Sequence, residues 1–155
     1  MDIEDTLLMI PGPVKVAPRV LRALSRPMIS HRSGDFSAIY SDCCQHLKQF
    51  FETKNDVVVM TGSGTVGMDG AVAGLIGRDD KIVIISNGKF GERFTEIGER
   101  YGKAIPVKFE WGTPFDLDKI EAALEQGAKA VAMVHNETSV GLTNPAKEVG
   151  KLAKK

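Results

Sequence analysis

The sequence predicts an α/β protein in which a mainly parallel sheet lies between two layers of helices. One observation is the alternation that begins at residue 57, where short apolar runs typical of buried strands are separated by segments with helical spacing of apolar residues. A second observation is that glycine-rich or polar segments follow these runs directly. Because the carboxyl ends of parallel strands meet at one edge of a sheet, these segments should converge there and form a ligand site.

The N-terminal part should contain two helices. Residues 1–34 are expected to form an arm with one short helix, which Pro18 can begin, and residues 35–155 to form part of a larger domain. A helix is predicted over about 35–51, with its apolar side chains on one buried face. Cys43 and Cys44 are neighbours on this helix, and that spacing is typical of neither a disulfide framework nor a metal motif.

The remaining elements alternate along the chain. Strands are predicted at 57–60, 81–86, 104–109 and 129–134, and helices at about 66–77, 90–101, 117–126 and from 146 onward. The first strand, VVVM, should be buried on both faces. Pro106 indicates an edge position or a strand end for the third strand, and Asp116 can cap the third of these helices. Residues 135–145 are predicted to be a loop.

Composition excludes several functional classes. Twenty basic and twenty acidic residues give a formal net charge of zero, which argues against a nucleic-acid binder. No apolar run approaches the roughly 20 residues of a membrane span, and the acidic N-terminus lacks the basic region of a secretory signal, so we expect a cytoplasmic protein. The three histidines, His31, His46 and His135, lack paired spacing, so no metal site is predicted.

The segment TGSGTVG at 61–67 joins the first predicted strand to a helix, which makes it a good cradle for an anion. Ser63 and Thr65 add hydroxyl donors. The spelling G-x-G-x-x-G is that of a dinucleotide fingerprint, but the next strand ends in Ser86–Asn87 and lacks the acidic residue that binds the ribose. We therefore predict a phosphate ligand without an adenosine ribose, and Gly67 is expected to be a packing residue on the helix.

Other side chains are expected at the same edge, and each has a simpler explanation. Phe90 follows the Asn87–Gly88 turn and can stack on a planar ligand or belong to the core. Thr138 and Ser139 can donate to a ligand, or can serve turn and cap chemistry. The backbone N–H of Gly12, between two prolines, can meet a carboxylate or belong to an ordinary loop.

Four motifs occur in one order, namely PGP, TGSGT, NGKFGER and HNETSVGLTNP, and they extend from about Leu8 to the end of the chain. This ordered set resembles the class V pyridoxal-phosphate aminotransferases, in particular the alanine–glyoxylate, serine–pyruvate and archaeal aspartate branch. The resemblance implies the large domain of the fold type I architecture, incomplete in this chain and without the small C-terminal domain. It also implies pyridoxal 5'-phosphate as the cofactor.

The resemblance also implies roles for individual residues. Ser63, Gly64 and Thr65 would hold the cofactor phosphate, and Phe90 would stack on the pyridine ring. Thr138 would contact the ring near its phenolic oxygen with Ser139 nearby, and the Gly12 backbone would line the pocket for the substrate carboxylate. The resemblance also implies less specific roles, in framing the active site or in an interface, for five further residues: His31, Arg32, Asn87, Arg93 and Glu137.

As a function, the resemblance implies transfer of an amino group between a small amino acid, of the alanine, serine or aspartate type, and a 2-oxo acid such as pyruvate or glyoxylate, by a homodimer. The lysine that forms the Schiff base and the aspartate beside the pyridinium nitrogen are expected beyond residue 155. Lys89 stands in the wrong motif for that lysine, so this chain alone is predicted to be inactive. The alternatives are a non-catalytic phosphate- or nucleotide-binding module, an interaction subunit, and a lyase or desulfurase of the same family.

Overall fold

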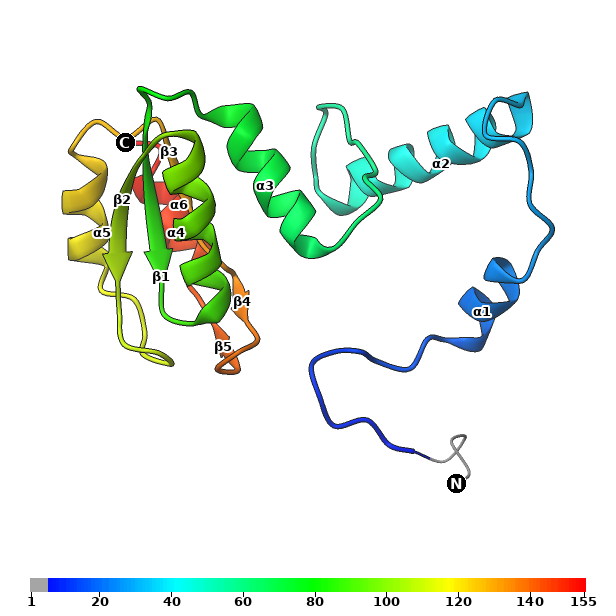
Figure 1. Ribbon diagram of the computed structural model, residues 1–155, viewed down its shortest axis with the longest axis horizontal. Coiled ribbons are helices and arrows are strands. Elements are labelled where there is room, and N and C mark those ends of the chain that lie inside the picture. Colours follow the sequence, from blue (N-terminus) through cyan, green and yellow to red (C-terminus); the bar gives the residue numbers. More distant parts are fainter. Residues whose placement is uncertain (1–5) are drawn as a thin grey trace. The chain divides into compact units, whose positions relative to one another are not determined.

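The computed structural model describes residues 6–155, which form parts of two compact units, Met1–Val59 and Met60–Lys155. The N-terminal unit contains α1 (Pro18–Leu24) and α2 (Gly34–Phe50), and both helices were predicted (Figure 1). Pro18 begins α1. The hydroxyl of Ser33 caps α2 by accepting a hydrogen bond from the N–H of Phe36 at 3.2 Å.

Two predictions for this part of the chain are wrong. No residue of α2 is buried, and Phe50 is 78% exposed, because within its own unit the helix has no second layer against which to bury its apolar face. Residues 57–60, predicted to be a buried strand, form no strand, and Val58 is 72% exposed. A strand forms only where a neighbouring strand completes its hydrogen bonds, and no described strand pairs with this segment.

The C-terminal unit is built on a parallel sheet of three strands, β1 (Lys81–Ser86), β2 (Lys103–Lys108) and β3 (Ala130–Ala132), in the order β2-β1-β3. Every residue of β1 after Lys81 is buried, as expected of a central strand. Within the described sheet β2 is an edge strand, which confirms the position that Pro106 indicated, and this proline lies opposite Ile84.

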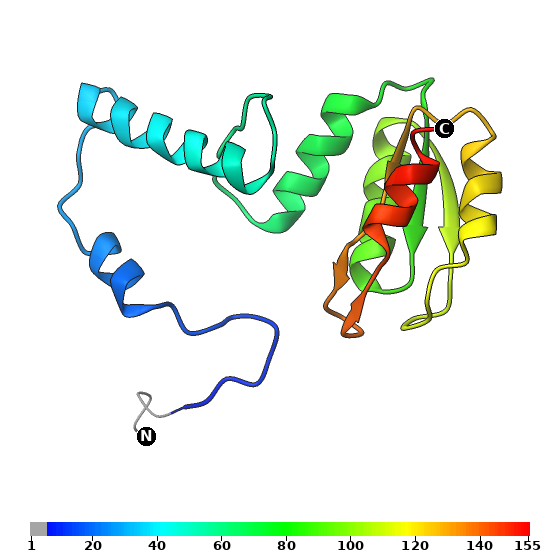
Figure 2. The same cartoon turned by 180° about the vertical axis from the view of Figure 1, so that it is seen from behind.

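Helices cover both faces of this sheet. In one core Ile82 and Ile84 of β1 pack with α3 (Gly64–Leu75) and α4 (Lys89–Tyr101), and in the other Val83 and Ile85 pack with α5 (Leu117–Leu124) and α6 (Ala146–Leu152). Figure 1 shows α4 in front of the sheet, and Figure 2 shows α6 on the opposite face. The predicted three-layer α/β/α arrangement is therefore confirmed for this unit.

Local capping also follows the sequence, with one addition. The side chain of Asp116 accepts hydrogen bonds from the N–H groups of Asp118 and Lys119, so its predicted role as the cap of α5 is confirmed. The predicted loop at 135–145 contains a short antiparallel hairpin, β4 (Asn136–Glu137) and β5 (Leu142–Thr143). Two-residue strands are too short to give a periodic signal, and that is why the sequence did not indicate them.

Within the described part of the chain, no helix is long and apolar enough to span a membrane.

The turn before β1 carries a carboxylate whose ionisation should stabilise the fold. Oδ2 of Asp80 accepts hydrogen bonds from Nζ of Lys129 at 2.6 Å and from the N–H of Gly77 at 2.8 Å. These bonds, that of Lys129 first, lower the pKa of Asp80 below its ordinary value of 3.8. A lowered pKa in the folded state means that the stabilisation is present above pH 3.8 and is lost as the pH falls through the lowered value.

We therefore expect Asp80→Asn to lower the urea midpoint of unfolding at neutral pH, and the gap between variant and parent to close as the pH falls below the ordinary pKa of 3.8. The measurement is a series of urea titrations of both proteins across that range. Asp79→Asn is the control, because its carboxylate is exposed and, among the described residues, forms its one ion pair with Lys103. A gap of constant size at every pH would show that the ionisation of Asp80 contributes nothing.

Candidate functional site

A cavity of about 500 Å³ lies in the C-terminal unit at the carboxyl end of the sheet. Its walls come from three segments, namely the start of α3, the first turns of α4 and the residues just beyond β3. The lining consists of Ser63, Gly64, Thr65, Met68, Phe90, Arg93, Phe94, Met133, Val134 and His135. Its size and its apolar walls with a few polar groups are typical of a small-molecule site.

The N-terminus of α3 opens into this cavity with unpaired donors. Ser63 is the N-cap residue, yet its side chain makes no cap hydrogen bond. Within the described chain, the N–H groups of Gly64 and Thr65 have no hydrogen-bond acceptor, and a Cβ placed on Gly64 would meet no atom within 4 Å. Such N–H groups carry partial positive charge, so the geometry suits a phosphate.

The N-terminus of α4 lies nearby but is already filled. The side chain of Glu137, which is 0% exposed, accepts hydrogen bonds from the N–H groups of Phe90 and Gly91 at 3.1 and 3.0 Å. The hydroxyl of Ser139 accepts a third bond, from the N–H of Lys89, at 2.9 Å. Of the two helix starts, only that of α3 can take an anionic ligand.

Arg93 connects the end of the cavity formed by the start of α3 to the aromatic wall formed by Phe90. Nη1 donates a hydrogen bond to the hydroxyl of Thr65 at 2.8 Å, and Cζ lies 5.1 Å from the centre of the Phe90 ring. The guanidinium therefore brings positive charge next to the open start of α3. A sequence signal for this pairing existed, because residues three apart on a helix share a face, as Phe90 and Arg93 do.

The other candidate residues of this unit lie outside the cavity lining. Thr138 is not among the lining residues, and neither is Ser139, whose hydroxyl donates to Glu137 at 2.6 Å. Their binding of a ligand stays a prediction. His135 lines the cavity instead, and its position three residues after the end of β3 was the available signal. The prediction that Gly67 packs is wrong, because a Cβ there would meet no atom within 4 Å.

A buried pair of asparagines holds the edge of the sheet together. Nδ2 of Asn87 donates to Oδ1 of Asn144 at 2.8 Å, and Nδ2 of Asn144 donates to Oδ1 of Asn87 at 3.1 Å. The same amide groups also donate to the carbonyls of Thr113 and Val134 at 2.8 Å. The segments after β1, β2 and β3 are thus bonded to one another, as their predicted convergence requires. Sequence reasoning did not identify Asn144.

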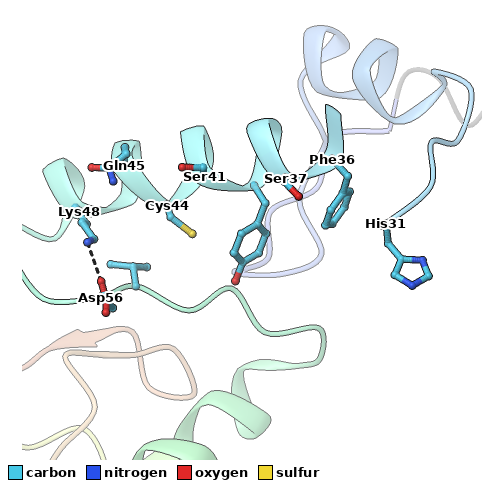
Figure 3. Close-up of a pocket in the computed structure, with 10 residues that line it drawn as sticks. His31, Phe36, Ser37, Ser41, Cys44, Gln45, Lys48 and Asp56 are labelled. Atoms are coloured by element: carbon cyan, nitrogen blue, oxygen red, sulfur yellow. Dashed lines mark hydrogen bonds and ion pairs between the residues drawn. The ribbon is translucent and has the colours of Figure 1, made fainter. Parts of the chain in front are cut away.

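Gly12, His31 and Arg32 belong to the N-terminal unit, and their functional roles stay predictions. His31 lines a separate cavity of about 420 Å³ between α2 and residues 56–57 (Figure 3). Figure 3 shows Lys48 directed toward Asp56, with which it forms an ion pair at 3.0 Å. Among the described residues no group of three His, Cys, Asp or Glu side chains is placed to hold a metal ion.

Comparisons with known proteins agree with this geometry. The family model for the class-V aminotransferases matches residues 19–155. An uncharacterised aminotransferase of Methanocaldococcus jannaschii is 45% identical over 99% of this chain and 41% of its own length. A protein of Anabaena cylindrica described as the 42 kDa subunit of a soluble hydrogenase is 37% identical over 91% of this chain and 38% of its own length.

The crystal structure of the ureidoglycine–glyoxylate aminotransferase of Bacillus subtilis superposes with a TM-score of 0.88 at 37% identity, covering 96% of this chain and 40% of that protein. The chain thus spans about two fifths of the length of the proteins it matches. The family implies pyridoxal phosphate as the cofactor, as the motifs predicted. With its motifs, its three-layer fold and a family match over most of its length, the chain belongs to the class-V aminotransferase family.

Proposed function

We propose that the protein is a pyridoxal-phosphate-dependent transaminase that moves an amino group between a small amino acid, of the alanine, serine or aspartate type, and a 2-oxo acid such as pyruvate or glyoxylate. Family membership supports the reaction class. The name of the Bacillus subtilis structure, a ureidoglycine–glyoxylate aminotransferase, supports glyoxylate as an acceptor. When bound, the cofactor supplies an electron sink for the amino-acid carbon, and the protein supplies binding and orientation.

One observation carries the proposal, namely the unpaired N–H groups of Gly64 and Thr65 at a cavity that also holds an aromatic ring. These groups and the hydroxyl of Ser63 would bind the phosphate, while Arg93 adds a positive charge and holds Thr65 in place. Phe90 would stack on the pyridine ring and fix its plane. The cavity holds donors for one phosphate, consistent with a ligand that has a single phosphate and a flat ring.

The remaining parts of the proposal rest on the resemblance to the family. Thr138 and Ser139 would lie near the phenolic oxygen, and the backbone of Gly12 would bind the substrate carboxylate. No lysine lines the cavity among the described residues, and the lysine and aspartate of the reaction are expected beyond residue 155. We therefore propose that the 155-residue chain binds the cofactor at most weakly and does not catalyse the reaction, and that the active protein is a cytoplasmic homodimer.

The test uses borohydride reduction in the presence of pyridoxal phosphate. In a protein that extends beyond residue 155, we expect reduction to fix the cofactor to one lysine, and small amino acids with glyoxylate or pyruvate to give the corresponding products. In the 155-residue chain we expect at most weak, reversible binding and no fixed adduct at any lysine. Specific labelling of a lysine in the short chain, or absence of transamination in the longer protein, would contradict the proposal.

A further inference from the structure

We infer that Glu137 and Ser139 act as positioning residues that hold the first turn of α4 and thereby set the place of the Phe90 ring in the cavity. This inference rests on the proposed function, because it concerns the wall on which the pyridine ring would stack. It gives Ser139 a role other than contact with the cofactor.

The contacts form a continuous network between the hairpin and the helix. Oε2 of Glu137 accepts from the N–H groups of Phe90 and Gly91, and Oε1 accepts from the N–H and the hydroxyl of Ser139 at 3.3 and 2.6 Å. The hydroxyl of Ser139 accepts from the N–H of Lys89. Three successive N–H groups of α4 are therefore held by two side chains that lie 46 to 50 residues further along the chain.

Glu137 is buried, so the stability of its carboxylate in the fold depends on these hydrogen bonds. Its side chain is 0% exposed, and no lysine, arginine or histidine of the described chain forms an ion pair with it. A buried carboxylate is costly unless its oxygens are hydrogen-bonded, and here the N–H groups of Phe90 and Gly91 and the positive end of the α4 dipole supply that compensation. Any change that removes an oxygen leaves buried donors unpaired.

The surrounding backbone is shaped to this carboxylate. A Cβ on Gly88 would lie 2.6 Å from Cδ of Glu137 and 2.7 Å from the hydroxyl of Ser139, so no larger residue fits before the helix. Glycine is required here because Glu137 and Ser139 approach the backbone closely. The backbone conformation of Gly88 does not require it, since that conformation is extended.

The aromatic wall is the part of the cavity that is bonded directly to this network. The N–H of Phe90 is itself one of the donors, so the place of its backbone is tied to Glu137. Ser63 and Gly64 at the open start of α3 make no hydrogen bond to Glu137 or Ser139 in the described structure. Loss of the carboxylate should therefore impair recognition of the ring and leave recognition of the phosphate intact.

The experiment measures dissociation constants for pyridoxal phosphate and for inorganic phosphate in the parent, in Glu137→Gln, in Phe90→Leu and in the double variant. Because Glu137→Gln would loosen the turn that carries Phe90, we expect it to weaken the binding of pyridoxal phosphate roughly 10-fold and the binding of inorganic phosphate less than about 2-fold. In the double variant the two effects should not add, because both act through the Phe90 ring. Glu96→Gln, an exposed carboxylate of the same helix, is the control and should change neither constant.

Equal weakening of both ligands in Glu137→Gln, or full additivity in the double variant, would overturn the inference. If inorganic phosphate does not compete with pyridoxal phosphate in the parent, the proposed function fails instead. Amide hydrogen exchange tests the inference without any ligand, so it distinguishes failure of the inference from failure of the proposed function. It also replaces the binding experiment if Glu137→Gln does not fold. Ser139→Ala should speed exchange of the N–H groups at 89–91, and unchanged exchange there would also overturn the inference.

Discussion

Replacing Ser63 with aspartate should weaken the binding of pyridoxal phosphate by roughly 10- to 100-fold, because the new carboxylate would stand beside a phosphate of charge close to −2. The fold should not suffer. Ser63 is exposed, it makes no cap hydrogen bond, and aspartate is among the preferred N-cap residues. A negative charge at a helix N-terminus contributes about 0.3–1 kcal/mol, so α3 should be as stable as before or more stable.

Ser63→Ala is the matched control, since it removes the hydroxyl without adding charge. We expect it to weaken binding less than about 10-fold, the loss of one hydrogen bond. Equilibrium titrations with pyridoxal phosphate measure both variants, and thermal unfolding verifies the fold. Binding by Ser63→Asp that equals that of the parent would place the phosphate away from the start of α3.

The largest loss of stability is expected for Gly91→Ala. A Cβ at this position would lie 2.7 Å from Cα of Ser86, so the crowding is against backbone that cannot rotate away. The N–H of Gly91 also donates to Glu137, and a displacement of α4 would strain that bond. Because overpacking usually costs about 1–3 kcal/mol, we expect the free energy of unfolding to fall by at least that amount.

Gly150→Ala in α6 is the comparison for that measurement. A Cβ on Gly150 would meet no atom within 4 Å, so the change should add helix propensity without crowding and raise the free energy of unfolding by about 0.5–1 kcal/mol. Urea denaturation of both variants gives the two values. Equal effects of the two substitutions would mean that α4 and β1 are not in close contact at Gly91.

Local sequence patterns were enough to predict most helices and strands of the fold. They failed where the structure of a segment depends on another segment that packs or pairs with it. The span of β1 could be predicted from KIVIIS, because a short continuous run of β-branched residues is typical of a central strand that is buried on both faces. VVVM has a similar composition, yet residues 57–60 form no strand, since the described chain offers them no pairing partner. The buried face predicted for α2 failed for the same kind of reason, because burial depends on what lies opposite.

The candidate site divides in the same way. The cavity is lined by Ser63, Gly64, Thr65 and Phe90, and it was indicated by their positions at the starts of helices that follow predicted strands. The contact of Arg93 with Thr65 joins residues 28 apart in the sequence, and the bond between Glu137 and Gly91 joins residues 46 apart. No local pattern encodes such contacts, so the filled start of α4 and the open start of α3 could be distinguished only in the structure.

The central claim is that the phosphate of the cofactor binds at the start of α3 while its ring lies against Phe90. Amide chemical-shift mapping by NMR with inorganic phosphate, pyridoxal and pyridoxal phosphate tests it most directly. We expect phosphate to shift the N–H signals of Gly64 and Thr65, pyridoxal to shift signals around Phe90, and pyridoxal phosphate to shift both sets. Phosphate that shifts the N–H signals at 89–91 and leaves those of Gly64 and Thr65 unchanged would contradict the account.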